Sequence, residues 1–301
     1  MNEMYHIPVL LNESIDALNI NPAGIYVDVT FGGGGHSREI LKRLTTGKLV
    51  AFDSDSDTEV NKINDDRFIF VRNNFRFLHN FLRYNKINEV DGILADLGVS
   101  SHHFDDASRG FSFRHNAKID MRMNKNAVFS ATQLLNEYAE SELKRIFRDY
   151  GELTNAYQLA KIIVEKRSKM PIKTVEDFLT AIKQVTPKKD ENKFLAKVFQ
   201  SLRIEVNKEI DALEQLLVHS FKSLKNKGRL VVITYHSVED RLVKNFMRSG
   251  NTDGTIKKDF YGNTDCPFKL ITRKPIVPND AEIEKNSRAR SAKLRIAEKM
   301  K

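Results

Sequence analysis

The chain has 301 residues, of which 41% are hydrophobic, so it is long enough for one large or two ordinary domains with buried cores. Lys and Arg number 49 against 40 Asp and Glu, a net charge of +9, which favours a polyanionic partner such as nucleic acid, with a solvated lysine surface as the alternative. The lone Cys266 excludes an intramolecular disulfide, and no leader-like or membrane-length apolar run is evident, so we expect a cytoplasmic protein without a membrane partner.

A short helix is expected from about residue 12 to 18, and the first functional pattern follows at residues 25–41. There an apolar, β-prone strand ends at Asp28, the glycines Gly32 to Gly35 form a hinge without side chains, and His36 opens a helix. A strand that leads through a glycine hinge into a helix N-terminus is typical of sites for nucleotide-like ligands.

The spacing of these glycines indicates the ligand. The dinucleotide fingerprint Gly-x-Gly-x-x-Gly, started at Gly32, fails at Ser37. An acid followed by spaced glycines, here Asp28, Gly32 and Gly34, resembles instead the first motif of S-adenosylmethionine-dependent methyltransferases. The acid would accept a hydrogen bond from the amino-acid end of that ligand. A glycine-rich loop with no ligand is the alternative.

Further strands, alternating with helices, are expected at residues 49–53, 67–71 and 89–96. The first ends in Asp53, about twenty residues after Gly32, which is the spacing of a ribose-binding acid, and the third ends in Asp96. Phe75 follows the second strand, where its ring either stacks on an adenine or belongs to the core. Because ligands lie at the carboxyl ends of parallel strands, these residues and Asp28 are expected to gather at one edge of the sheet.

The loop-like stretch after Asp96 contains residue types that bind metals, namely His102, His103, Asp105 and Asp106. Adjacent residues diverge on any regular element, and no helical His-x-x-x-His spacing is present. We therefore expect no metal.

Strand signals are missing from about residue 130 to 224, so residues 106–200 are expected to form a helical insertion. Helices are expected at residues 57–64, before the insertion, and at 140–150, 155–168, 174–185 and 191–225. Basic side chains of the insertion suit either a phosphate-facing or a solvated surface, and they include Lys161, Arg167, Lys169, Lys188 and Lys189.

Strands that resume the sheet are expected at residues 228–234, 268–272 and 292–297. Ser237 is expected to cap the helix after the first of them, and His236 is a candidate to face the site. The neighbours His236, Ser237 and Asp240 cannot easily form a catalytic triad. A basic loop, Asn286 to Arg290, suits either a phosphate contact or solvent.

Eight short motifs occur in a fixed order along the chain. They are His6 to Leu10, Thr30 to Ser37, Asp96 to Ser101, Arg109 to Phe113, Asp120 to Met123, Phe199 to Asn207, His236 to Arg241 and Ser287 to Arg295. Together they resemble the RsmH (MraW) family of S-adenosylmethionine-dependent 16S rRNA cytosine-N4 methyltransferases. The resemblance implies an α/β, Rossmann-like class I methyltransferase fold. Residues 1–105 and 201–301 would form a mostly parallel seven-stranded sheet domain, and residues 106–200 an inserted helical domain that recognises rRNA.

The resemblance and the glycine pattern together assign a set of binding residues for the cofactor S-adenosyl-L-methionine. The set is Asp28, Gly34, Gly35, His36, Asp53, Phe75, Asp96 and His103. The glycines and His36 would line the methionine end, and Asp53 would hold the ribose hydroxyls. The chain departs from the family where His102 and His103 replace the usual Pro-Gln and where Leu153 replaces a second acid.

The implied reaction is methyl transfer to N4 of cytosine 1402 in the decoding region of 16S rRNA, either free or in the small ribosomal subunit. We expect Asp96, with Ser100 and Ser101 as further candidates, to orient N4, while the unpaired base stacks on Phe111 or Phe113. A nicotinamide-dependent oxidoreductase and a non-catalytic RNA-binding assembly protein are the alternatives. The chain is compatible with a monomer or a homodimer.

Overall fold

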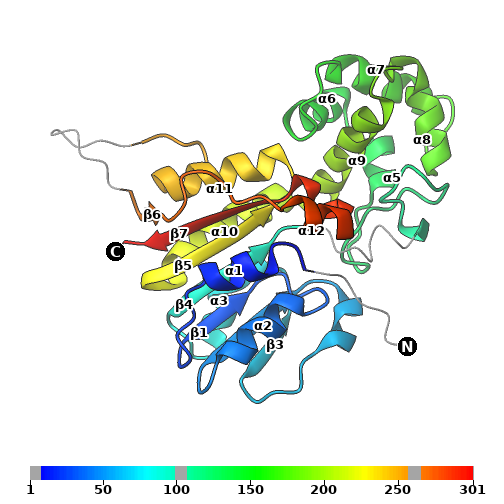
Figure 1. Cartoon of the computed structure of the whole chain (residues 1–301). Helices are drawn as coiled ribbons and strands as arrows, with labels where there is room; N and C mark the ends of the chain where they lie inside the picture. Colours follow the sequence, from blue (N-terminus) through cyan, green and yellow to red (C-terminus); the bar gives the residue numbers. More distant parts are fainter. Residues whose placement is uncertain (1–7, 99–106, 257–265, 301) are drawn as a thin grey trace. The chain divides into compact units, whose positions relative to one another are not determined.

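The computed structural model describes residues 8–98, 107–256 and 266–300 of the chain (Figure 1). The chain divides into two compact units. Met1–Gly98 and Asp211–Lys301 make up the first, and Val99–Ile210 make up the second. The second unit is longer at both ends than the expected 106–200, and at its C-terminal end the helix Glu191–Asn207 continues beyond residue 200.

The first unit is built on a seven-stranded sheet in the order β3-β2-β1-β4-β5-β7-β6. Its strands are β1 Ile25–Asp28, β2 Lys48–Asp53, β3 Phe68–Arg72, β4 Val90–Asp96, β5 Leu224–Thr234, β6 Phe268–Leu270 and β7 Lys293–Lys299. The strands from β1 to β5 pair in parallel, whereas β7 pairs antiparallel with both β5 and β6. The expected α/β fold with a mostly parallel seven-stranded sheet is therefore confirmed.

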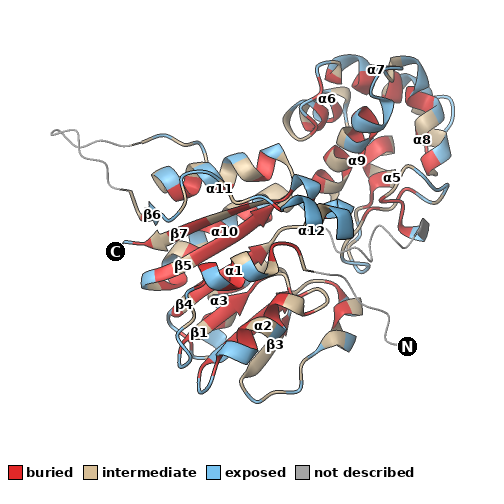
Figure 2. Ribbon diagram, in the orientation of Figure 1, coloured by how far each residue is buried: buried red, intermediate tan, exposed pale blue. Residues whose placement is uncertain are grey.

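Helices cover both faces of this sheet. They are α1 Leu11–Ala17, α2 Gly35–Arg43, α3 Leu78–Tyr84, α10 Glu209–Ser223, α11 Ser237–Ser249 and α12 Asp280–Lys285. Side chains alternate between two apolar layers along each strand: Val232 of β5 packs with α3, α10 and α11, whereas Val231 packs with α1 and α2. Figure 2 shows the central strands buried between these layers.

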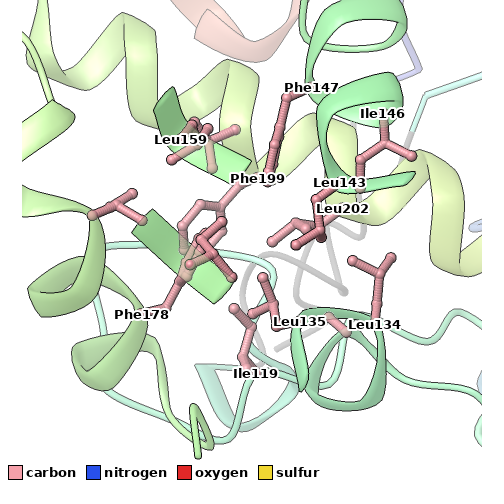
Figure 3. Packing of buried hydrophobic residues seen from close by; sticks show 14 of the residues in the cluster. Ile119, Leu134, Leu135, Leu143, Ile146, Phe147, Leu159, Phe178, Phe199 and Leu202 are labelled. Atoms are coloured by element: carbon pink, nitrogen blue, oxygen red, sulfur yellow. The ribbon is translucent and has the colours of Figure 1, made fainter. Parts of the chain in front are cut away.

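The second unit is helical. Its helices are α5 Ala131–Glu137, α6 Glu140–Asp149, α7 Ala156–Arg167, α8 Val175–Ile182 and α9 Glu191–Asn207. They enclose one apolar cluster, in which Phe178 and Phe199 contact at 5.9 Å between ring centroids and Phe147 is fully buried (Figure 3). This unit therefore has a hydrophobic core of its own.

Two expected helices are wrong in part. The helix expected over 191–225 is divided at Lys208, which has a φ of 51°, and β5 already begins at Leu224. Neither Gly nor Pro marks this break. Instead Asn207 bonds to the carbonyl of Met121 at 2.8 Å and to the amide of Met123 at 2.7 Å. The segment expected as a helix over 57–64 is a 3₁₀ turn, η1 Ser56–Asn61.

Within the described ranges, every helix is too short or too polar to traverse a lipid bilayer.

Candidate functional site

Three acids close neighbouring strands at one edge of the sheet. Asp28, Asp53 and Asp96 are the last residues of β1, β2 and β4, which run in parallel in the order β2-β1-β4. In register, Asp28 lies beside Ala51 of β2 and Leu94 of β4. The three acids therefore lie at the carboxyl ends of adjacent parallel strands, on the side of the sheet where the sequence predicted them.

Both carboxylate oxygens of Asp28 accept hydrogen bonds from the segment that follows β1. Its Oδ2 accepts a 2.7 Å hydrogen bond from the Ser37 hydroxyl, and its Oδ1 accepts from the backbone N–H of Thr30 at 3.1 Å. The side chain is buried, and this burial raises the pKa of Asp28. Asp28 thus ties β1 to the first turn of α2.

Thr30 connects this loop to β4, and Tyr235 connects β4 to the end of β5. The backbone N–H of Asp96 donates to the Thr30 hydroxyl at 2.7 Å, and Oδ1 of Asp96 accepts from the Tyr235 hydroxyl at 2.8 Å. Burial, and then the charge of Asp96, raise the pKa of Tyr235 well above its ordinary value, so Tyr235 keeps its proton and acts as the donor. Gly98 allows this contact, since a Cβ there would lie 2.7 Å from the tyrosine ring.

Asp53 holds the glycine loop from the other side. Its Oδ2 accepts from the N–H of Gly32 at 2.8 Å, and its Oδ1 accepts from the N–H of Asp55 at 2.8 Å. Burial raises the pKa of Asp53 to about 6, although both hydrogen bonds oppose this shift. Each carboxylate oxygen has a second lone pair, so Asp53 can still accept from the hydroxyls of a ligand.

Open space lies beside Gly33, and the later glycines face protein. A Cβ at Gly33 would meet no atom within 4 Å. By contrast, a Cβ at Gly35 would lie 2.1 Å from Cγ of Pro8, and Gly34, with a φ of 74°, faces the Phe31 ring at 2.9 Å. A Cβ at Gly32 would also be nearly free, with only the carbonyl oxygen of Thr30 at 4.0 Å. The side open to a ligand is therefore at Gly32 and Gly33, which are not in the expected cofactor set, and Gly34 and Gly35 are explained by packing and backbone conformation.

His36 and Phe75, two other expected cofactor residues, contact mainly protein. His36 is buried in the first turn of α2, and its Nε2 lies 3.2 Å from the carbonyl oxygen of Val9. Phe75 opens the 3₁₀ turn η2 Phe75–Phe77 after β3 and packs, half-buried, on the apolar layer of the sheet. Its ring contributes to the core and also remains partly accessible.

Several expectations are not met or lie beyond the described residues. Ser100, Ser101, His102, His103, Asp105 and Asp106 fall outside the described ranges. Phe111 is wrong as a stacking platform because it is buried in the core of the helical unit, and half-buried Phe113 packs on Phe199. The guanidinium of Arg167, one of the expected phosphate-facing cations, donates a 2.8 Å hydrogen bond to the carbonyl oxygen of Leu135.

The expected cap of α11 is also wrong. The N-cap is His236, whose side chain accepts from the N–H of Glu239, and Ser237 is the first helical residue. Glu239 in turn accepts from the N–H of Tyr235 at 3.1 Å. The ring of His236 therefore caps the helix, and its buried Nε2 lies 3.1 Å from the Glu239 carboxylate without the geometry of a hydrogen bond.

Thr30 and Tyr235 are the site residues that the sequence analysis missed. Thr30 stood off the glycine pattern, and Tyr235 lies 139 residues from its partner Asp96. The only sequence signal for Tyr235 is its position directly after the end of an expected strand. The structure brings both residues to Asp96.

Comparisons with known proteins cover nearly the whole chain. The model of the MraW methylase family matches residues 3–300. A ribosomal RNA small subunit methyltransferase H from Bacteroides fragilis (strain YCH46) is 60% identical over 296 residues, which is 98% of this chain and 97% of that protein. Proteins of the same name from Phocaeicola vulgatus and Flavobacterium johnsoniae are 58% and 55% identical, each over at least 98% of both chains. The similarity therefore extends over the residues of both units.

Proposed function

The chain belongs to the MraW methylase family, and on this premise we propose that it transfers a methyl group from S-adenosyl-L-methionine to N4 of a decoding-region cytosine in small-subunit rRNA, in the cytoplasm. Relatives of 55–60% identity are named ribosomal RNA small subunit methyltransferase H, which supports rRNA as the substrate. The observation that carries the proposal is the hydrogen-bonded line from Asp28 through Thr30 to Asp96 and Tyr235, next to the open side of Gly33.

The residues present fit the cofactor. A backbone with no Cβ at Gly33 leaves the space that an adenosyl ligand needs, and Asp53 has acceptor capacity for two ribose hydroxyls. Phe75, half-buried at the end of β3, offers a ring face for the adenine. When bound, the cofactor supplies a methyl group that is electrophilic because it is attached to a sulfonium.

The protein's main task is alignment, since the methyl group is already reactive. The lone pair of cytosine N4 is delocalised into the ring and must be directed at the methyl carbon. Asp96 accepts a hydrogen bond from an N4–H and so fixes the orientation of the amine, with Ser100 and Ser101 as further candidates. A bound cofactor would supply the methyl carbon to N4, and its thioether would be the leaving group. The amine is acidic after transfer and loses its proton to water, so no strong base is required.

Tritiated methyl transfer into small ribosomal subunits from a strain that lacks the enzyme tests the proposal. Wild-type protein should label one cytosine at N4. Asp96→Ala should transfer at least about a hundredfold more slowly under saturating cofactor, because N4 loses the acceptor that orients it. Asp66→Ala, at an exposed carboxylate elsewhere in the same unit, is the control and should behave as wild type. Absence of transfer by the wild type would reject the function, and near-normal transfer by Asp96→Ala would reject the role of Asp96.

A further inference from the structure

A basic turn lies at the same sheet edge as Asp96. The 3₁₀ turn η5 Ser287–Ser291 directly precedes β7, whose first residues pair with the end of β5. Leu294 lies beside Ile233, and Ile233 lies beside Asp96. Adjacent strands are roughly 4.8 Å apart, so the start of β7 is about 10 Å from Asp96 across the sheet.

The turn is held rigidly by its central residue. Ala289 is fully buried in the apolar layer that contains α1 and α2. Its N–H donates to the carbonyl of Asn286 at 2.9 Å, and its own carbonyl accepts from Ala292 at 2.8 Å. The Asn286 side chain also accepts from the N–H of Arg288 at 3.2 Å. The exposed residues Arg288 and Arg290 therefore flank the buried Ala289 in a hydrogen-bonded turn.

The next cations along the chain, Lys293 and Arg295, are neutralised within the protein. Asp240 accepts from Arg295 at 2.6 Å and from Lys293 at 3.4 Å. Among the described residues, the guanidinium of Arg290 has no hydrogen-bond or ion-pair partner. The acids of the preceding helix, α12, begin at Asp280, whereas the arginines directly precede β7, which starts at the Asp96 end of the sheet.

A cation near this edge would suit the proposed substrate. Three carboxyl groups at the sheet edge repel a phosphate backbone, yet the target base must approach Asp96 in an unpaired state. An unpaired nucleotide has to be anchored through its own backbone. Arginine is the side chain best suited to this, because its planar guanidinium matches two phosphate oxygens.

We propose that Arg290 of η5 binds a backbone phosphate of the rRNA strand beside the target cytosine. This inference rests on the proposed function, since it names the surface that binds its substrate. The guanidinium of Arg290 supplies a paired contact to the phosphate. Its charge offsets the acids of the edge and holds the strand while the base reaches Asp96.

The test compares Arg290→Ala with Arg290→Lys and with Arg83→Ala. Arg83 is exposed in the last turn of α3, which leads to the opposite edge of the sheet, so its loss is a matched control. Filter binding to 16S rRNA is measured across salt concentrations, and methyl transfer to small subunits gives KM and kcat. Arg290→Ala should weaken binding and raise KM about tenfold, with kcat within about twofold, and should lower the slope of log affinity against log salt by about 1.

The remaining variants separate the possible outcomes. Arg290→Lys should keep the wild-type salt slope with intermediate affinity, because the charge remains while the paired geometry is lost. Arg83→Ala should match the wild type. The proposal is overturned if Arg290→Ala retains wild-type affinity and slope, or if Arg83→Ala lowers both equally. Failure of the wild type to methylate small subunits rejects the proposed function instead, and the salt slopes still report on the turn.

Discussion

The hydroxyl of Tyr235 donates a 2.8 Å hydrogen bond to Oδ1 of Asp96, and this contact joins the ends of β4 and β5. Oδ1 of Asp96 is thereby held by a hydroxyl that keeps its proton. The same hydrogen bond also fixes the orientation of the second carboxylate oxygen. In the proposed reaction, Tyr235 is a positioning residue that acts through Asp96.

Tyr235→Phe should lower kcat about ten- to a hundredfold, the effect of losing one hydrogen bond to a charged group. Affinity for the cofactor and KM for small subunits should not change. Tyr26→Phe is the matched control, because it removes a buried hydroxyl that accepts from the N–H of Asn21 just before β1, away from the acidic edge. Tyr26→Phe should lower the free energy of unfolding by about 1 kcal/mol and leave kcat unchanged. A kcat for Tyr235→Phe equal to that of the control would contradict the role.

Cofactor binding should depend on pH through Asp53. Burial raises its pKa to about 6, so the carboxylate that accepts from ribose is lost as the pH falls through that value. Calorimetric titration should show constant affinity above about pH 7 and a fall of up to tenfold per unit below about pH 6.

Asp53 affects the stability of the unliganded protein in the opposite sense. Because the folded-state pKa is raised, its favourable contribution to folding is fully present below about pH 4 and is lost as the pH rises through about 6.

Two variants test the role of Asp53 in cofactor binding. Asp53→Asn should bind the cofactor weakly, and its cofactor affinity should not vary with pH. Asp65→Asn is the control, since Arg67 lowers the pKa of Asp65 to about 2, and it should keep the wild-type profile. An unchanged profile in Asp53→Asn would assign the titration elsewhere.

Gly33→Ala and Gly35→Ala should separate binding from folding. A methyl group at Gly33 meets open space, so the free energy of unfolding should change by less than about 0.5 kcal/mol while cofactor affinity falls at least about tenfold. A methyl group at Gly35 meets the Pro8 ring at 2.1 Å, so this variant should lose about 1–3 kcal/mol of stability. Urea unfolding and calorimetry measure both quantities, and normal cofactor binding by Gly33→Ala would place the ligand elsewhere.

Asn207→Ala should destabilise the helical unit by about 2–4 kcal/mol. Its side chain makes three hydrogen bonds, to the carbonyls of Met121 and Arg203 and from the N–H of Met123, and it supports Met121 at a φ of 59°. Asn192→Ala, exposed in the first turn of the same helix, should unfold at the wild-type urea concentration. Equal midpoints for the two variants would show that these bonds contribute little.

The parts of the fold predicted correctly depend on local signals. Each strand of the acidic edge is an apolar run that ends in its acid, and four consecutive glycines reveal the hinge at residues 32–35. The contact of Tyr235 with Asp96 spans 139 residues, and no local pattern marks it. The break at Lys208 lacks Gly and Pro and depends on Asn207 holding a distant loop. Phe111 is indistinguishable in sequence from a surface aromatic, and only packing buries it.

The position of the insertion between β4 and β5 has a consequence for biosynthesis. These strands are adjacent, with Asp96 beside Ile233, although the whole helical unit separates them in the chain. During translation the helical unit, whose contacts are local, can fold before β5 leaves the ribosome, and it then shortens the loop that must close. The sheet is completed only when β7, the last of the seven strands in chain order, inserts between β5 and β6. A nascent chain that is released early therefore lacks its arginine turn and keeps an unpaired edge at β5, which is prone to aggregation.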